Sequence, residues 1–318
     1  MDPGAIRSLR AKLTRWYDRV KRDLPWRRTR DPYAIWISEV MLQQSRVATV
    51  IPYYERFLRR FPDAAALALA PEGDLLAMWS GLGYYSRVRN LQKAARQIAE
   101  HGLFPTDYDS ILELAGVGAY TAAAIASIAF GLPHAVVDGN VRRVTARITN
   151  DGNVDAQQAA DRLLDRHDPA RWNQAVMELG ATICLPREPR CKQCPIATNC
   201  AAREAGTQAD LPPKRGKVEP ESLERTLLLI RRHGRILLVA SPRVEGFWDL
   251  PEPFRGVRVG VIVGTFTHTI THRHYRFTVK EAAARQGPQR SRWVAERQLG
   301  TVPLATTARK ALKLYKVL

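Results

Sequence analysis

The sequence predicts two domains of different fold class, a mainly α-helical N-terminal domain and a small α/β C-terminal domain. The length of 318 residues exceeds what one typical domain requires. Apolar residues recur at three- and four-residue spacings from about residue 6 to residue 205, which is the period of amphipathic helices. After a polar, proline-rich stretch the pattern changes to short β-rich runs. We therefore expect domains over 1–205 and 222–318, joined by a linker over 206–221.

Five runs in the first part of the chain show the helical period, with proline and glycine between them. They are LRAKLTRWYDRV, DPYAIWISEVMLQQ, NLQKAARQIAE, YTAAAIASIAF and AADRLLDRH. Strand-like alternation is absent from this part of the sequence. The prediction for it is therefore a helical domain without a sheet.

The linker and the second domain differ in composition. The segment QADLPPKRGKVEP is basic and rich in proline, which favours a polyproline II conformation. The runs RTLLLIRR, RILLVAS, GVIVGTFTHTITH and RHYRFTVK are short and separated by turns, as strands are. The final TTARKALKLYKVL returns to the helical period. The sequence contains no internal repeat.

The charge of the chain indicates the class of its partner. The chain has 49 Lys and Arg against 31 Asp and Glu, a formal net charge of +18, and 45% of its residues are apolar. A well-cored protein with so positive a field favours a polyanion, so we expect nucleic acid as the partner. An anionic membrane surface is the lesser option, and a merely soluble basic surface is the simplest alternative. No stretch predicts a membrane span.

All four cysteines lie in one window of seventeen residues, CLPREPRCKQCPIATNC, between Cys184 and Cys200. The N-terminal segment is charged throughout and has no apolar signal core, so we expect a cytoplasmic protein in which such cysteines bind metal or react. The spacing is C-x6-C-x2-C-x5-C, with Cys191 and Cys194 between the outer two. A single short knuckle is unusual for structural zinc, and four thiolates suit a [4Fe-4S] cluster. Spacing alone leaves zinc and reactive thiols open.

Two glycines precede a helix of small residues in LELAGVGAYTAAAIASIAF. Gly116 and Gly118 permit a tight turn and the close approach of a ligand. Free amides at the start of the helix, near Ala119, favour an anion such as a DNA phosphate. An ordinary turn between two helices could have the same local sequence.

From about Trp16 to Cys200 the chain resembles the endonuclease III superfamily of DNA glycosylases. LAGVGAYTA is similar to the helix-hairpin-helix motif of that superfamily, and the cysteine spacing is similar to its [4Fe-4S] loop. The resemblance implies a helix-hairpin-helix glycosylase domain with an iron-sulfur loop over 184–200. It also implies a [4Fe-4S] cluster as cofactor and base excision repair as function. The four implied cluster ligands are Cys184, Cys191, Cys194 and Cys200.

Within the superfamily the chain resembles the adenine glycosylases of the MutY type, through LPWRRTRDPYAIWISEVMLQQSRVATVIPYYERF and GLGYYSRVRNL. The superfamily's lyases form a Schiff base with a lysine two residues after the second hairpin glycine, and Tyr120 stands there without an amine. The resemblance implies a monofunctional hydrolase, a monomer of the bacterial nucleoid, that removes adenine opposite 8-oxoguanine or guanine from double-stranded DNA. A bifunctional glycosylase/lyase for oxidised pyrimidines and a non-catalytic iron-sulfur DNA-binding protein are the alternatives.

Two carboxylates are the candidate catalytic groups. Glu39 lies in the apolar run AIWISEVML, where burial disfavours the charged form and keeps a proton available near neutral pH. Asp138 precedes a helical run in VVDGNVRRV, which predicts a helix N-cap. By the resemblance, Glu39 protonates N7 of adenine and Asp138 stabilises the oxocarbenium-like sugar. The resemblance also assigns Asn140 and Tyr120 to this site. Without it, a solvated helical glutamate is the simpler interpretation of Glu39.

A base inside a duplex must be extruded before it can be excised. By the resemblance, three residues line the adenine pocket: Trp26, Arg27 and Gln174. A glutamine amide can both donate to and accept from the adenine edge. Gln44 and Tyr84 match the residues that enter the base stack beside the orphaned 8-oxoguanine. Ser45 follows Gln44 where the family usually has threonine, so a hydroxyl is kept. For Trp26 a plain core position is the simpler alternative.

Residues from about Ser222 onward resemble the Nudix-like domain of the same glycosylases. Active Nudix hydrolases need a glutamate-rich helix, but only RGVRVGVIV lies between WDLPEPF and GTFTH, so we expect a recognition module without its own catalysis. Thr267 and His268, in FTH, match the loop that the family uses to read 8-oxoguanine. The even separations of His268, His272 and His274 place them on one face if the strand is regular, although a metal site there lacks a fourth ligand.

Overall fold

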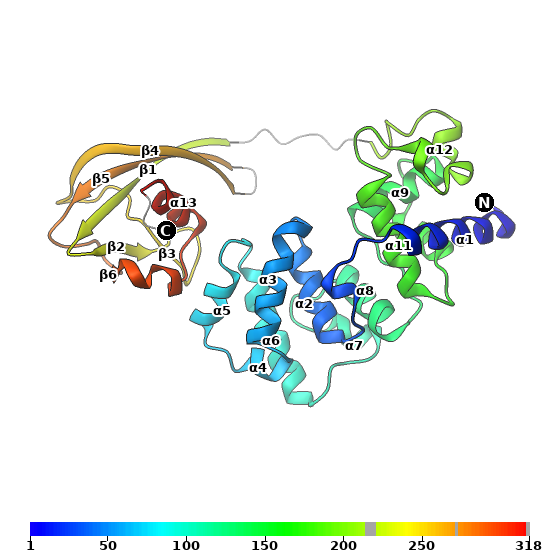
Figure 1. The fold of residues 1–318 in the computed structure, drawn as a ribbon, viewed down its shortest axis with the longest axis horizontal. Coiled ribbons are helices and arrows are strands. Elements are labelled where there is room, and N and C mark those ends of the chain that lie inside the picture. Colours follow the sequence, from blue (N-terminus) through cyan, green and yellow to red (C-terminus); the bar gives the residue numbers. More distant parts are fainter. Residues whose placement is uncertain (214–220, 271–272, 316–318) are drawn as a thin grey trace. The chain divides into compact units, whose positions relative to one another are not determined.

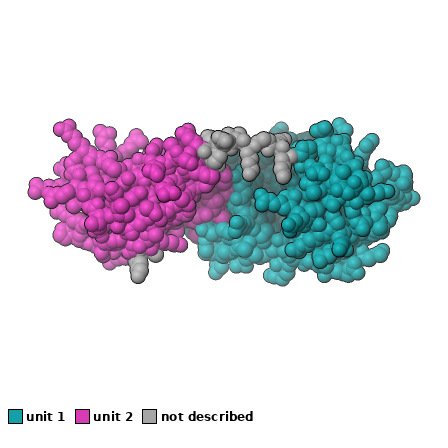
Figure 2. Space-filling model, turned by 90° about the horizontal axis from the view of Figure 1, so that it is seen from above, with its two compact units in different colours: residues 1–68, 90–215 teal, residues 69–89, 216–318 magenta. Residues whose placement is uncertain are grey.

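The computed structural model describes residues 1–213, 221–270 and 273–315, and it forms two compact units. Residues 1–68 and 90–215 belong to the first unit, and residues 69–89 and 216–318 belong to the second (Figure 2). The short segment 69–89 therefore groups with the C-terminal part of the chain. The domain limits drawn from the sequence stay predictions, and residues 214–220 of the predicted linker lie outside the described residues.

The chain before residue 206 is helical, as predicted (Figure 1). Its helices are α1 (Pro3–Val20), α2 (Pro32–Leu42), α3 (Val47–Arg60), α4 (Ala64–Ala68), α5 (Glu72–Trp79), α6 (Ser86–His101), α7 (Tyr108–Leu112), α8 (Ala119–Phe130), α9 (Gly139–Thr149), α10 (Ala156–Leu163), α11 (Pro169–Thr182) and α12 (Ala201–Glu204). Short 3-10 helices are η1 (Pro25–Arg27), η2 (Cys191–Gln193) and η3 (Ala197–Asn199). In the described part of the chain, no helix combines the length and the apolar character that crossing a membrane requires.

Helix α2 lies in the interior of the first unit. It is apolar on all sides, and every residue from Tyr33 to Met41 is buried. The helix begins at Pro32, and the side chain of Asp31 accepts hydrogen bonds from the first free backbone amides. Helix α8, rich in alanine, packs against it. The only carboxylate of α2, Glu39, is therefore placed inside the protein.

A second group of helices, α1, α9, α10 and α11, shares another apolar core in the same unit. The cysteine loop packs on this core. Ile196 from that loop is buried in it, and Cys184 and Cys194 pack against it. The loop is thus positioned by the same packing that fixes α9 and α11, the two helices that bring polar side chains to the site described below.

The second unit contains a mixed sheet with one helix packed on it, which confirms the predicted small α/β domain (Figure 1). Besides α5 and the start of α6, its elements are β1 (Glu221–Arg232), β2 (Arg235–Ala240), β3 (Trp248–Asp249), β4 (Arg258–Ile270), β5 (Arg273–Ala283), β6 (Ser291–Ala295), η4 (Glu296–Thr301) and α13 (Thr306–Leu314). The strand order is β3-β2-β1-β5-β4, and β6 also pairs with β2. Strands β1 and β5 run parallel, and the other pairs are antiparallel.

The centre of this sheet is buried on both faces. Leu227 and Leu229 pack in the cluster that includes α13, whereas Leu228 and Ile230 pack in a second cluster. Such double burial explains the uninterrupted apolar run in β1. Between Phe254 and the start of β4 the described chain makes a short turn with no helix, where a Nudix hydrolase would need its signature helix.

Thr267 and His268 lie in strand β4 and point to opposite faces of the sheet, because side chains alternate along a strand. Thr267 is exposed, and His268 is half-buried on the face covered by α13. Burial lowers the pKa of His268, and the positive charges of Lys310 and Arg243 lower it further. The neutral imidazole is therefore the favoured form.

The histidines near the end of β4 do not share one face. His268 pairs with Tyr275 across the β4–β5 ladder, and His274 pairs with Thr269. Directly paired residues share a face, so His268 and His274 lie on opposite faces and on different strands. The expectation of one regular strand was wrong because two antiparallel strands cover this stretch. His272 lies outside the described residues.

Candidate active site

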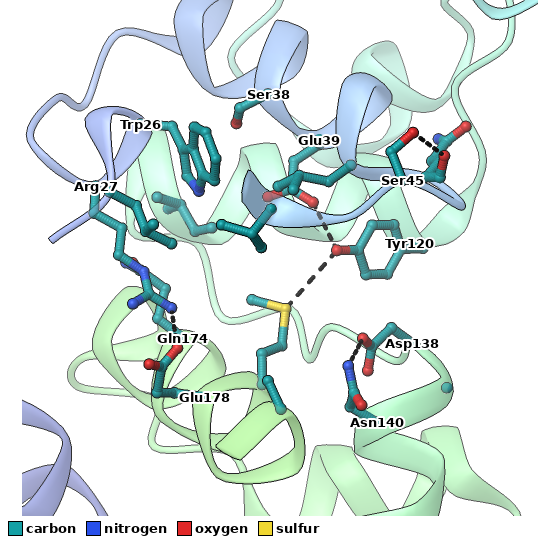
Figure 3. Close-up of a pocket in the computed structure, with 18 of the residues that line it drawn as sticks. Trp26, Arg27, Ser38, Glu39, Ser45, Tyr120, Asp138, Asn140, Gln174 and Glu178 are labelled. Atoms are coloured by element: carbon teal, nitrogen blue, oxygen red, sulfur yellow. Dashed lines mark hydrogen bonds and ion pairs between the residues drawn. The ribbon is translucent and has the colours of Figure 1, made fainter. Parts of the chain in front are cut away.

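A cavity of about 640 Å³ opens in the first unit between α2, α8, α9 and α11 (Figure 3). It brings together most of the residues that the sequence analysis assigned to catalysis and to base contact. They are Trp26, Arg27, Glu39, Gln44, Ser45, Tyr120, Asp138, Asn140 and Gln174. Tyr84, Thr267 and His268 belong to the second unit.

Glu39 is 5% exposed and accepts a hydrogen bond at Oε2 from Tyr120 Oη, at 2.6 Å. Burial raises the pKa of Glu39 to about 7, because the charged form loses its hydration. The hydrogen bond from Tyr120 and the charge of Arg27 oppose this shift, and the nearby charge of Asp138 adds to it. The result is a carboxyl group that can hold a proton near neutral pH, as the sequence predicted.

Tyr120 lies in the first turn of α8, just after the two glycines. Its hydroxyl is also 3.8 Å from the sulfur of Met177. Burial raises the pKa of Tyr120 well above its ordinary value, and the negative charge of Glu39 adds to the shift. The phenol therefore stays neutral and acts as a hydrogen-bond donor rather than a nucleophile.

Asp138 is the N-cap of α9, which confirms the structural role predicted for it. Its Oδ1 accepts from the backbone N of Val141 at 2.7 Å, and its Oδ2 accepts from Asn140 Nδ2 at 2.8 Å. Asn140 is fixed in turn by Arg143 Nη2, which donates to Asn140 Oδ1 at 2.9 Å. Gly180 lies against it, since a Cβ there would come within 2.6 Å of Asn140 Cβ. The carboxylate of Asp138 is thus held in one position.

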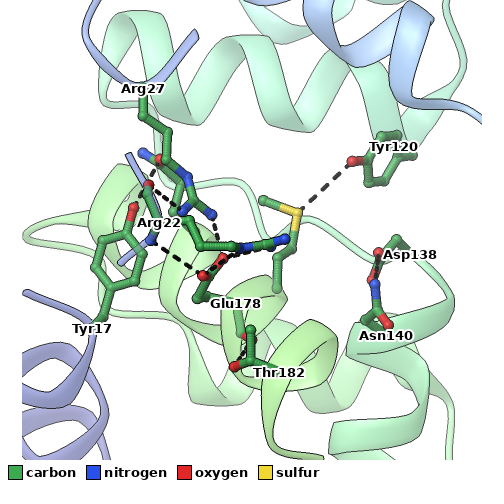
Figure 4. Close-up of polar contacts among 10 residues, drawn as sticks. Tyr17, Arg22, Arg27, Tyr120, Asp138, Asn140, Glu178 and Thr182 are labelled. Carbon is green, nitrogen blue, oxygen red and sulfur yellow. Dashed lines mark hydrogen bonds and ion pairs between the residues drawn. The ribbon is translucent and has the colours of Figure 1, made fainter. Parts of the chain in front are cut away.

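The third carboxyl group of the pocket, Glu178 on α11, was missed by the sequence analysis (Figure 4). It accepts from Arg22 Nε at 2.7 Å and from Arg27 Nη2 at 2.7 Å. Burial pushes the pKa of Glu178 upward, but the hydrogen bonds from the two arginines outweigh it and leave the pKa below its ordinary value. Gln174, one turn earlier, accepts at Oε1 from Tyr17 Oη at 3.0 Å. A glutamate within the apolar run QAVMELGA was the available signal, as it was for Glu39.

Trp26 and Ser45 lie at the edges of the pocket. Trp26 is 7% exposed and packs edge-on against Tyr54, with ring centroids 5.5 Å apart. It is therefore both a core residue and a lining residue. Ser45 follows the end of α2 and is half-buried.

Gln44 and Tyr84 share an unusual backbone conformation. Their φ angles are 55° and 48°, in the left-handed region that side chains other than glycine rarely adopt. Both side chains are exposed. Strain of this kind persists where the surrounding structure or a function requires it.

The glycine turn before α8 leaves backbone amides at the start of the helix uncovered by side chains. Gly116 has φ of +76°, and a Cβ there would come within 2.5 Å of Asn90 Cβ, so only glycine fits. The backbone N of Ala115 donates to Gln97 Oε1 at 2.8 Å, which ties the turn to α6. Gly118 is the N-cap of α8 without a side-chain cap, and the described residues leave open space where its Cβ would be. The first amides of α8 are therefore available to an anion.

The four cysteines are free thiols that line one pocket after α11. Arg147, 2% exposed, donates from Nη1 to Cys184 Sγ at 3.3 Å. Burial raises the pKa of Cys194 to about 12 and also raises the pKa of Cys200. The thiolate forms are thus disfavoured unless a positive group joins them.

This donor set fits an iron-sulfur cluster. Among the described residues, no group of three or more His, Cys, Asp or Glu side chains is arranged to hold a single metal ion. A [4Fe-4S] cluster is larger than an ion and is held by one thiolate at each iron. Iron would also offset the burial that disfavours these thiolates. Four thiols around one pocket, with a buried arginine beside one of them, meet these requirements.

Comparison with known proteins shows the family to which the chain belongs. The family model for the HhH-GPD superfamily base excision DNA repair proteins matches residues 37–167. The adenine DNA glycosylase of Homo sapiens is 32% identical to it, in an alignment that covers 99% of this chain and 75% of the human protein. This chain belongs to the adenine DNA glycosylase family.

Solved structures support the fold of this glycosylase. A thermostable thymine-DNA glycosylase matches with a TM-score of 0.60 and 29% identity, over 64% of this chain and 98% of that chain. A non-covalent complex of endonuclease III with DNA matches with a TM-score of 0.57 and 22% identity, over 65% of this chain and 99% of that chain. The helix-hairpin-helix glycosylase fold expected from the sequence is confirmed.

Proposed function

We propose that this chain removes adenine from double-stranded DNA in base excision repair, by hydrolysing the bond between the base and its sugar. Family membership supports the activity. The observation that carries the mechanism is the pairing of Glu39, with a pKa raised to about 7, and Asp138 in one pocket. A pair of carboxyl groups in different environments, one acting as general acid and the other stabilising the sugar, is typical of enzymes that hydrolyse glycosidic bonds.

Glu39 is the general acid that protonates N7 of adenine. With a pKa of about 7, about half of the Glu39 side chains are protonated at neutral pH. Protonation makes the base a better leaving group. The hydroxyl of Tyr120 binds one oxygen of the carboxyl group, which fixes its orientation and leaves the other oxygen for the proton.

Asp138 stabilises the positive charge that develops on the sugar when the C1′–N9 bond breaks. Donors from Val141 and Asn140 hold its two oxygens, so the carboxylate needs no rearrangement as that charge develops. Tyr120 offers no amine for an imine with the sugar. The reaction proposed is therefore monofunctional hydrolysis.

The pocket and its surroundings supply recognition. Trp26, Arg27 and Gln174 contact the extruded adenine. Gln44, Ser45 and Tyr84 contact the base stack at the mispair, and Thr267 and His268 contact the opposing base, which we propose is 8-oxoguanine or guanine. The turn at Gly116 and Gly118 binds a DNA phosphate through the first amides of α8. The chain acts as a monomer.

A [4Fe-4S] cluster bound by the four cysteines would shape and charge the loop that follows α11. Anaerobically purified protein should then be brown, with about four irons per chain. A colourless protein with one zinc per chain and full activity contradicts this assignment.

The activity is tested with a duplex containing one A:8-oxoguanine pair, followed by alkali and gel analysis. Strand scission at the adenine is expected, together with weaker scission at A:G and none at A:T. A product trapped by borohydride would favour the bifunctional glycosylase/lyase. Tight binding without any scission would favour the non-catalytic DNA-binding protein.

A further inference from the structure

A second cavity, of about 570 Å³, adjoins the proposed adenine pocket in the first unit. Four residues line both cavities: Arg22, Arg27, Ile128 and Gln174. The rest of its lining includes Asp18, Lys21, Thr29 and Ala170, which do not line the adenine pocket. The two cavities are therefore separated by a wall of side chains.

Most of this wall is held by side-chain hydrogen bonds (Figure 4). Arg22 and Arg27 both donate to Glu178, and Tyr17 donates to Gln174. Arg27 also donates to the backbone oxygen of Arg22 at 3.1 Å and lies over the ring of Tyr17. Such a wall opens when one side chain rotates, whereas a wall of packed backbone would not.

Arg22 is the side chain most able to move. Its side chain is 39% exposed, against 13% for Arg27. When Arg22 turns to solvent, the carboxylate of Glu178 keeps its bond from Arg27 and is not left as an unpaired buried charge. Arg22 donates to Glu178 from Nε at 2.7 Å and from Nη2 at 2.8 Å, so opening breaks both bonds, and water then solvates the freed guanidinium. The second arginine thus allows the first to leave.

We infer that the second cavity is the exit for free adenine and that Arg22 is its gate. This inference rests on the proposed function. The adenine pocket must admit a nucleotide that is still joined to the duplex, so DNA occupies that entrance during the reaction. After hydrolysis the base is a small, neutral molecule with hydrogen-bonding edges, and the polar wall of the second cavity lies beside it. Adenine then leaves while the abasic DNA is still bound.

The test narrows the second cavity without touching the first. Ala170→Phe adds a ring at a half-buried position of α11 that lines only the second cavity. Ala99→Phe, at an exposed position of α6, is the matched control. Under single-turnover conditions with labelled adenine, alkaline scission measures bond cleavage, and filtration of the undenatured complex measures adenine release.

In the wild type and in Ala99→Phe, adenine should pass the filter as fast as scission proceeds, while the DNA is retained. In Ala170→Phe, the rate of scission should stay within about twofold of the wild-type rate. Adenine release should be slower than in the wild type by about tenfold or more, which corresponds to ~1.4 kcal/mol in the barrier to release. Release at the wild-type rate in Ala170→Phe overturns the exit route. So does adenine that stays with the wild-type complex until the DNA dissociates.

Arg22→Ala removes the proposed gate instead of narrowing the exit. Its result does not depend on how well Ala170→Phe folds. Labelled adenine added to the complex with abasic DNA should exchange into the pocket of Arg22→Ala about tenfold faster than into the wild type. Equal exchange rates overturn the role of Arg22. A failure of the proposed function is distinguished from both results, because the wild type would then give no scission at all.

Discussion

Glu39 and Glu178 line the same pocket from two different helices, α2 and α11, and their pKa values are shifted in opposite directions. Both are nearly inaccessible, at 5% and 1% exposure. The pKa of Glu39 is raised to about 7 by burial, whereas the pKa of Glu178 is lowered because hydrogen bonds from Arg22 and Arg27 outweigh burial. The difference teaches that the partner of a buried carboxyl group, and not burial alone, decides whether it is an acid or a fixed charge.

Each environment follows from the elements around it. Around Glu39, α2 is apolar on all sides, and the hydrogen bond given to its carboxyl group comes from the neutral phenol of Tyr120. Around Glu178, the segment between α1 and α2 supplies two guanidinium groups. One wall of the pocket is suited to deliver a proton, and the other is suited to hold cations near the base.

The largest effect that we expect from a substitution at either glutamate is the loss of excision rate in Glu39→Gln. Glu39→Gln removes the proton but keeps the shape of the side chain, so single-turnover adenine release should fall by about 10² to 10⁴-fold. Duplex binding should remain close to that of the wild type, as measured by titration at fixed salt. A loss of less than about tenfold would remove Glu39 from the mechanism.

Replacing the other glutamate, Glu178, by glutamine should lower the stability of the protein. Glu178→Gln leaves Arg22 and Arg27 without their carboxylate, and the free energy of unfolding in urea should fall by roughly 3 kcal/mol. Glu100→Gln, at an exposed position of α6, is the control and should change it by less than about 0.5 kcal/mol. If both variants are equally stable, the ion pairs of Glu178 contribute nothing and the contrast between the walls fails.

The raised pKa of Glu39 should also make the stability of the protein depend on pH in a definite direction. The pKa of Glu39 is raised on folding, so the folded state binds the extra proton between the unfolded pKa near 4.5 and the folded pKa near 7. Stability from this group is present below that window and lost as the pH rises through it. Glu39→Gln should therefore gain stability relative to the wild type between pH 5 and pH 8, on the order of 2 kcal/mol. A difference that does not change over that range contradicts the raised pKa.

The smallest expected effect extends the comparison to two neighbouring residues of β4, where orientation rather than charge separates the roles. Thr267 is exposed, and His268 is half-buried beside α13. Thr267→Ala should weaken the preference for A:8-oxoguanine over A:G by about 1 kcal/mol, the scale of one polar base contact. His268→Ala should change the preference less. Binding and single-turnover cleavage on both duplexes at matched salt measure it, and a larger effect of His268→Ala would reverse the assignment.

The patterns that the sequence predicted well are local. The period of apolar residues gave the helical domain and the β-rich domain, and the position of Asp138 before a helical run gave its N-cap. Glu39, which interrupts a long apolar run, was assigned because the resemblance to the MutY-type glycosylases selected it. Glu178 interrupts a similar run and was missed, because its partners Arg22 and Arg27 lie some 150 residues earlier in the chain.

The sequence by itself determined the two fold classes, the four thiols in one loop and the glycine turn before α8. Each depends on residues within about one helix or one loop of each other. The tertiary structure alone decided which buried glutamate keeps its proton, which of Thr267 and His268 is exposed, and which side chains separate the two cavities. Burial, charge partners and strand orientation are set by residues that are distant in the sequence, and the pKa of a carboxyl group depends on the first two.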